Sequence, residues 1–99
     1  MKADKLLLEL ELLLEQSGYT LRKERGAFRG SDCVIKGDKL VIINKNKPAE
    51  SQLGTIARVL SDINFEDIYI KPVVRKELSS LWSRLSIEAQ LPAEKLELE

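Results

Sequence analysis

The stretch that decides the fold is Ser31–Lys47, SDCVIKGDKLVIINKNK. Apolar residues that favour β-strands lie on both sides of Gly37-Asp38, a dipeptide that suits a two-residue hairpin turn. The stretch therefore predicts a β-hairpin. Residues 40–43 are apolar without interruption, which is typical of a central strand that is covered on both of its faces.

The turn also predicts the register of the hairpin. With Lys36 and Lys39 as the last paired residues, counting outward places Asp32 directly opposite Ile43. Opposed residues share a face, and successive residues alternate between faces. One face is then expected to carry Asp32, Val34, Val41, Ile43 and Lys45, and the other Cys33, Ile35, Leu40, Ile42 and Asn44. On this register the thiol of Cys33 is expected to be buried and unreactive.

The 99 residues predict one domain over 1–99, with 93–99 as a frayed tail. The longest strictly apolar run has four residues, so no membrane span is expected. A single cysteine excludes an intramolecular disulfide and favours a cytoplasmic protein. The chain has no histidine, which excludes histidine-dependent nucleophile systems and zinc sites built on histidine or several cysteines. Oxygen-ligated metals such as magnesium remain compatible with the composition.

The net charge is zero, but the charges are unevenly spread. Residues 19–47 carry eight Lys/Arg and three acids, a net charge of +5, while residues 1–18 and 48–99 carry −2 and −3. Such a basic segment predicts contacts with the phosphates of a nucleic acid. The candidate residues are Arg22, Lys23, Arg25, Arg29, Lys45 and Lys47. The alternative interpretation is that these charges keep an edge strand soluble and unpaired.

Periodicity predicts the remaining elements. Apolar residues at helical spacing indicate helices from Asp4 to about Ser17, from Pro48 to about Ile63, and from Pro72 onward. Alternating residues indicate strands at 19–25 and 67–71. The order is helix, three-strand meander, helix, strand, helix, which predicts an α/β fold. Its mixed four-stranded sheet would be flanked by helices, and the last strand would be joined by a right-handed crossover.

Leu8 and Leu12 fall outside the apolar face of the first helix, four residues apart among charged neighbours. A single stripe that faces the core does not explain them. One interpretation is a helix buried on two sides, with the C-terminal tail on its second face. The other is a strip for a protein partner or for a homodimer.

The order of elements and two residues of the hairpin resemble the PD-(D/E)XK nuclease superfamily, whose core is that of the restriction endonucleases. That family carries an Asp on its second strand and an acid, any residue and a Lys on its third. Asp32 matches the Asp, Asn44 the middle position and Lys45 the Lys. Ile43 stands where the second acid is expected, so the motif is degenerate.

In that family two carboxylates hold magnesium and the lysine activates water. The resemblance thus implies Asp32 and Lys45 as catalytic residues, with Asp32 as the metal ligand. It implies Glu15 or Glu50 as a migrated second acid, and Gln52 at a position where some relatives carry a helix glutamine.

Because Ile43 removes one ligand, the expected function is that of a non-catalytic binding or interaction module with a nuclease-like core. It is expected to need no cofactor and to contact nucleic acid through its basic strands. Two alternatives stay open. One is a magnesium-dependent nuclease with a migrated acid. The other is a protein-interaction or dimerisation domain that uses Leu8 and Leu12.

Overall fold

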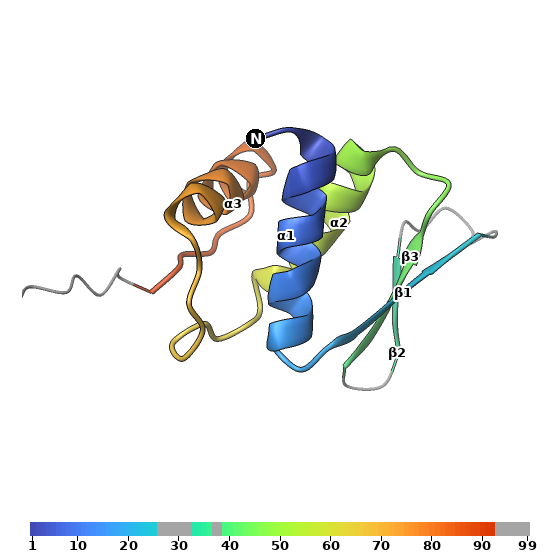
Figure 1. Cartoon of the computed structure of the whole chain (residues 1–99), viewed down its shortest axis with the longest axis horizontal. Coiled ribbons are helices and arrows are strands. Elements are labelled where there is room, and N and C mark those ends of the chain that lie inside the picture. The colour runs from blue at the N-terminus through green and yellow to red at the C-terminus, as the bar shows by residue number, and fades with distance from the viewer. Residues whose placement is uncertain (26–32, 37–38, 93–99) are drawn as a thin grey trace, which may run out of the picture.

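Three helices and three strands follow one another in the part of the chain that the structure, a computed structural model, describes: residues 1–25, 33–36 and 39–92 (Figure 1). In chain order they are α1 (Ala3–Gln16), β1 (Thr20–Glu24), β2 (Cys33–Lys36), β3 (Leu40–Asn44), α2 (Ala49–Leu60) and α3 (Pro72–Arg84). The three predicted helices and the first strand are confirmed. None of the helices in these ranges is long and apolar enough to cross a membrane.

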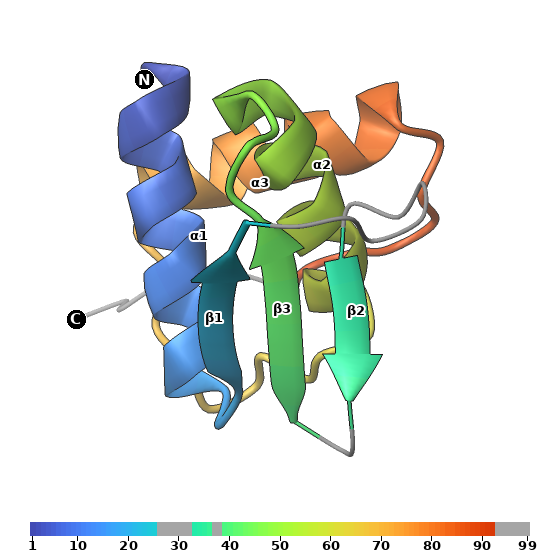
Figure 2. The same ribbon diagram turned by 90° about the vertical axis from the view of Figure 1, so that its right-hand side faces the viewer.

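The sheet has three strands in the order β1-β3-β2 (Figure 2). β3 lies in the centre, parallel to β1 and antiparallel to β2. The predicted meander and the mixed four-stranded sheet are therefore wrong. The physical reason lies in the apolar content of the strands. β3 is almost wholly apolar and takes the central place, while β1 carries charges at three of its five positions and stays at an edge.

The hairpin of β2 and β3 is offset by one residue from the predicted register. Lys36 pairs with Leu40 and Cys33 with Ile43, so three residues rather than two separate the paired strands. The predicted pairing of Asp32 with Ile43 is wrong, and Asp32 itself lies outside the described residues, as does the predicted turn at 37–38. Because β3 is apolar on both faces, its hydrophobic pattern does not distinguish two registers that differ by one residue.

The core lies between the sheet and the helices α1 and α2, which cover one face of the sheet (Figures 1 and 2). Val41 and Ile43 point from β3 into this core, and both are fully buried. The apolar stripe predicted for α1 is confirmed: Leu6, Leu7, Leu10, Leu13 and Leu14 are all buried. α2 contributes a similar stripe, and α3 packs on α1 and α2.

Residues 67–71 do not form the predicted fourth strand. They belong to an irregular segment between α2 and α3, in which Phe65 and Ile70 are buried in the core while Tyr69 is 77% exposed. Alternation of apolar and polar residues occurs in any extended segment with one buried side, whether or not that segment pairs with a strand. Here that side packs on helices, and the segment pairs with no strand in the described sheet.

Two local features anchor the helices. Gly18, which ends α1, has a φ of +92°, a conformation that side chains disfavour and glycine tolerates. Trp82 of α3 is 2% exposed, and its indole Nε1 donates a hydrogen bond of 2.7 Å to the carbonyl oxygen of Ala57 in α2. This bond joins α2 and α3 through two residues that are 25 positions apart in sequence.

We expect Trp82→Phe to lower the free energy of unfolding by about 2 kcal/mol, because the variant loses a buried hydrogen bond and leaves a gap beside Ala57. Urea denaturation followed by circular dichroism measures the change. The control, Tyr69→Phe, alters an exposed ring and should change the stability by less than about 0.5 kcal/mol. Equal effects of the two substitutions would contradict the interhelical role of Trp82.

Candidate functional site

The parallel pairing of β1 with β3 brings the carboxyl-terminal ends of both strands to one end of the sheet. Glu24 pairs with Asn44, and the backbone amide of Lys45 donates a hydrogen bond of 3.0 Å to the carbonyl oxygen of Glu24. Arg25 and Lys45, the residues that follow this last pair, are therefore adjacent across the strands. In a meander, β2 would have separated them.

A tight turn joins β3 to α2 and carries the next cation, Lys47. The backbone amides of Asn46 and Lys47 donate to the Oδ1 and the carbonyl oxygen of Asn44, at 3.0 and 3.2 Å. From α2, the Nε2 of Gln52 donates a hydrogen bond of 2.8 Å to the carbonyl oxygen of Lys47. Gln52 is only 7% exposed. The turn is thus fixed both by its own polar groups and by a buried side chain.

We call Arg25, Lys45 and Lys47 the basic end. All three residues are exposed, and the turn leads directly into the N-terminus of α2 at Ala49. The first amides of a helix carry a partial positive charge, which adds to that of the three side chains. Glu50 is the one acid in the first turn of α2. The charges and the helix terminus together favour an anionic ligand at this end of the sheet.

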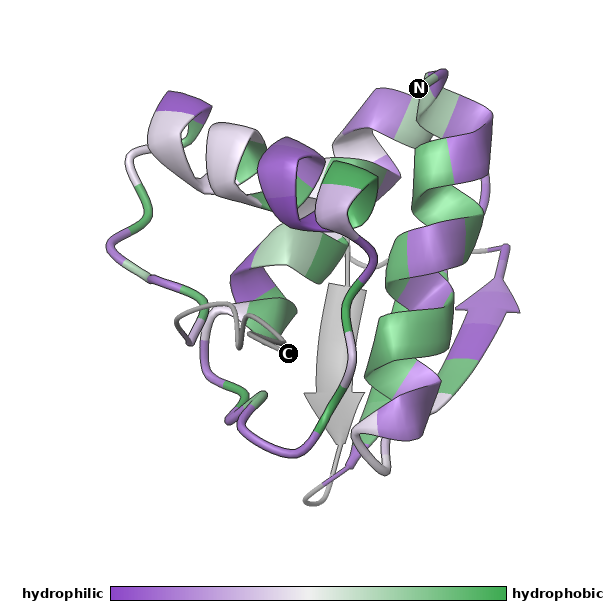
Figure 3. Ribbon diagram, turned by 60° about the vertical axis from the view of Figure 1, so that its left-hand side comes forward, coloured by the Kyte–Doolittle hydropathy of each residue, from purple (hydrophilic) through white to green (hydrophobic). Residues whose placement is uncertain are grey.

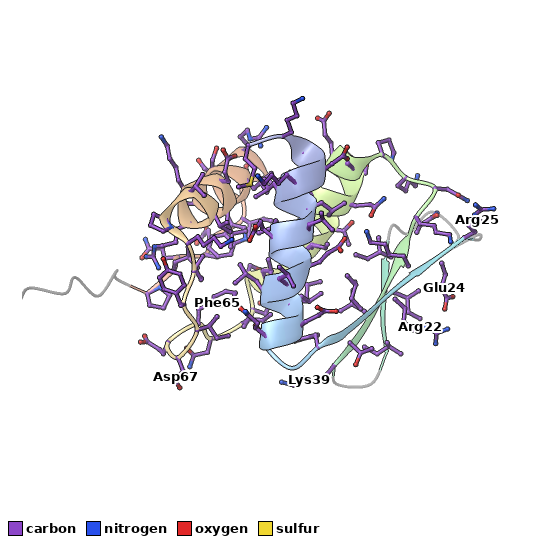
Figure 4. All side chains as sticks on the ribbon, viewed as in Figure 1. Arg22, Glu24, Arg25, Lys39, Phe65 and Asp67 are labelled. Atoms are coloured by element: carbon purple, nitrogen blue, oxygen red, sulfur yellow. The ribbon has the colours of Figure 1, made fainter. Side chains whose placement is uncertain are left out.

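Arg22 and Lys23 are placed differently from the basic end. As neighbours on β1 they point to opposite faces of the sheet. Arg22 forms an ion pair of 2.7 Å with Glu24 on the face away from the helices (Figure 4), and Lys23 forms one of 2.5 Å with Glu11 of α1. Each of these two side chains is thus held by a carboxylate of β1 or α1. Arg29, the sixth predicted contact, lies outside the described residues.

The residues that the nuclease resemblance implies are not brought together in the described part of the chain. Ile43, at the position of the expected acid, is fully buried in the core, whereas Lys45 is exposed at the end of β3. Glu15 lies in the last turn of α1, just before Gly18, at the amino-terminal end of β1 and β3. Glu50 lies beyond Lys45, in the first turn of α2. Asp32 is outside the described residues.

No group of three or more Asp, Glu, Cys or His side chains able to hold a metal ion occurs among the described residues. A carboxylate introduced at position 43 would point into the apolar core beside Val41, rather than toward Lys45 at the end of the strand. The α/β scaffold that the resemblance implies, with a fourth strand after the crossover helix, is also not the one observed.

The sequence predicts the three cations of the basic end as candidate phosphate contacts. It does not predict the hydrogen bonds that fix the turn between β3 and α2. Asn44 was assigned to the middle of a nuclease motif, and Gln52 to the position of a helix glutamine. In the structure they fix the turn that carries Lys45 and Lys47. The available signal was the segment NKNKP at 44–48, since Asn bonds readily to nearby backbone amides and Pro starts helices.

Comparison of the chain with protein-family models, with curated proteins and with solved structures finds no match. The nuclease family assignment therefore stays a prediction.

We expect Ile43→Glu to destabilise the domain by at least about 3 kcal/mol, because it buries an unpaired carboxylate in the core. Denaturant unfolding measures the loss, and Ile43→Val, which keeps the apolar side chain, should cost only about 1 kcal/mol. Magnesium should not stabilise the Glu variant. A rise in its melting temperature with magnesium, absent from the parent protein, would show that position 43 reaches a metal site after all.

Proposed function

We propose that this chain is a non-catalytic binding domain that contacts the phosphate backbone of a nucleic acid through its basic end. The observation that carries the proposal is the position of Arg25 and Lys45 just after the paired ends of adjacent strands, with Lys47 in the turn that leads to the N-terminus of α2. Lys and Arg side chains and helix N-termini are the usual protein partners of phosphate oxygens.

The distribution of the acids supports this proposal. Glu9, Glu11 and Glu24 form ion pairs with Lys71, Lys23 and Arg22. Asp62 and Asp67 lie far from the basic end, beside a hollow of about 350 Å³ at the amino-terminal end of β3. Figure 4 shows Asp67 and Arg25 at opposite sides of the molecule. Asp62 and Asp67 therefore lie away from the three cations, whereas Glu50 follows them directly, in the first turn of α2.

The aromatic residues support backbone contacts rather than base stacking. Phe65 and Trp82 are buried in the core. Tyr19 lies under Lys39, whose Nζ is 5.3 Å from the ring centre, at the other end of the strands. Phe28 lies outside the described residues. With no described aromatic side chain at the basic end, binding should depend on charge and hardly on base sequence.

We expect weak binding that falls steeply with salt, because each phosphate contact releases counterions. Three contacts give a logarithmic salt slope of about −2.7, so a fourfold rise in salt should weaken binding about fortyfold. The double variant Arg25→Ala/Lys45→Ala should lower the affinity at low salt and reduce the slope to about −0.9. Fluorescence anisotropy with labelled DNA and RNA oligonucleotides measures both quantities.

The matched control is Arg58→Ala/Lys76→Ala. It removes the same net charge from exposed positions on α2 and α3, away from the basic end, and should leave the slope near that of the parent protein. The proposal is wrong if no oligonucleotide binds at tens of micromolar protein in low salt. It is equally wrong if the control weakens binding as much as the double variant does, since the effect would then reflect net charge alone.

A further inference from the structure

One side of α1 exposes large apolar side chains that the core does not use. Leu8 is 61% and Leu12 is 51% exposed, one helical turn apart, and the neighbouring Tyr69 is 77% exposed. Leu12 and Tyr69 line the same hollow of about 120 Å³ between α1 and the segment that leads into α3. Figure 3 shows α1 and this segment on the same side of the molecule. We call Leu8, Leu12 and Tyr69 the α1 patch.

The charged residues beside the two leucines have a symmetric spacing. Lys5 precedes Leu8 by three residues and Glu15 follows Leu12 by three residues, and both are exposed. Along a helix, residues three or four apart lie on one face. The exposed face of α1 thus reads lysine, leucine, leucine, glutamate at matched intervals, with opposite charges at its two ends.

In an antiparallel pair of such helices, the basic end of each face meets the acidic end of the other, and the leucines meet in the middle. We propose that α1 packs antiparallel against α1 of a second copy of this chain, around a two-fold axis level with Leu10. Leu8 of each copy then lies opposite Leu12 of the other, and Lys5 opposite Glu15. This is an isologous interface, in which one patch serves both partners.

The other charges of α1 do not oppose this pairing. Asp4 falls opposite Gln16, which is uncharged. Glu9 of one copy falls level with Glu11 of the other, but both lie on the flanks of α1, to either side of the face that carries Leu8 and Leu12. Each is also paired within its own chain, Glu9 with Lys71 at 3.1 Å and Glu11 with Lys23. No like charges without a partner face one another across the axis. The charge pattern therefore selects the antiparallel arrangement and a second copy as the occupant.

The dimer is independent of the proposed phosphate contacts. Figure 4 shows Arg25 at the end of β1 that lies away from α1, so packing of α1 against a second copy leaves Arg25 accessible. A 14-residue helix with one neighbouring tyrosine offers less area than the roughly 800 Å² per partner of standard interfaces. We therefore expect a weak dimer that forms at about 10–100 μM protein or above.

Sedimentation equilibrium over a range of protein concentrations tests the proposal. The parent protein should shift from monomer to dimer, and Leu8→Ser/Leu12→Ser should remain folded and monomeric, because neither side chain belongs to the buried core. Lys5→Glu alone should weaken the dimer about tenfold, because two attractive pairs become repulsive. The swap Lys5→Glu/Glu15→Lys should restore it, because each pair is again of opposite sign.

The control Lys76→Glu reverses a charge on α3 and should leave the dimerisation constant unchanged. A monomer at every concentration overturns the proposal and assigns the α1 patch to another occupant. A dimer that survives Leu8→Ser/Leu12→Ser uses a different surface, which also overturns it. A dimer weakened by Lys5→Glu but not restored by the swap contradicts the antiparallel pairing.

Discussion

The burial of β3 between two edge strands and beneath two helices is the constraint on which the rest of this structure depends. Val41 and Ile43 have no exposed surface, and they pack beneath the apolar stripes of α1 and α2. Burying two such side chains contributes about 3–6 kcal/mol, a large part of the net stability of a small domain. Of the three strands, β3 has the most apolar surface to bury, so it takes the centre of the sheet.

Both proposed surfaces follow from that arrangement. Because β3 separates β1 from β2, the end of β1 lies beside the start of the turn into α2, and Arg25 comes next to Lys45. Because the core takes one face of α1, the residues on the other face are free to vary. Packing within one chain therefore does not account for the apolar side chains of Leu8 and Leu12 on that face.

The sequence predicted the helices well because their signals are local. Leu10 and Leu14 recur at helical spacing, Gly18 ends α1 with a positive φ, and Pro72 starts α3. The sheet was predicted poorly because strand order and register depend on partners that are distant in sequence. No residue within 19–25 indicates that β1 pairs with β3 rather than with β2. The alternation around Ile68 and Ile70 likewise predicts an extended segment without naming what it packs against.

The candidate site was predicted in composition but not in arrangement. A basic segment was visible from the charges of residues 19–47. That Lys23 pairs with Glu11 depends on how α1 lies against β1, and that Gln52 supports Lys47 depends on where α2 begins. Such contacts arise from tertiary structure. The nuclease resemblance rested on the order of elements and on two residues, and the fourth strand of that order is not part of the described sheet.

The central claim is that β1 pairs in parallel with β3, since this pairing creates the basic end. Cross-strand nuclear Overhauser effects between backbone protons test it most directly in solution. The account predicts contacts that join Leu21 with Val41 and Lys23 with Ile43, together with a slowly exchanging amide at Lys45, which donates to Glu24. Contacts that instead join β1 to β2 in an antiparallel meander would contradict it and would separate Arg25 from Lys45.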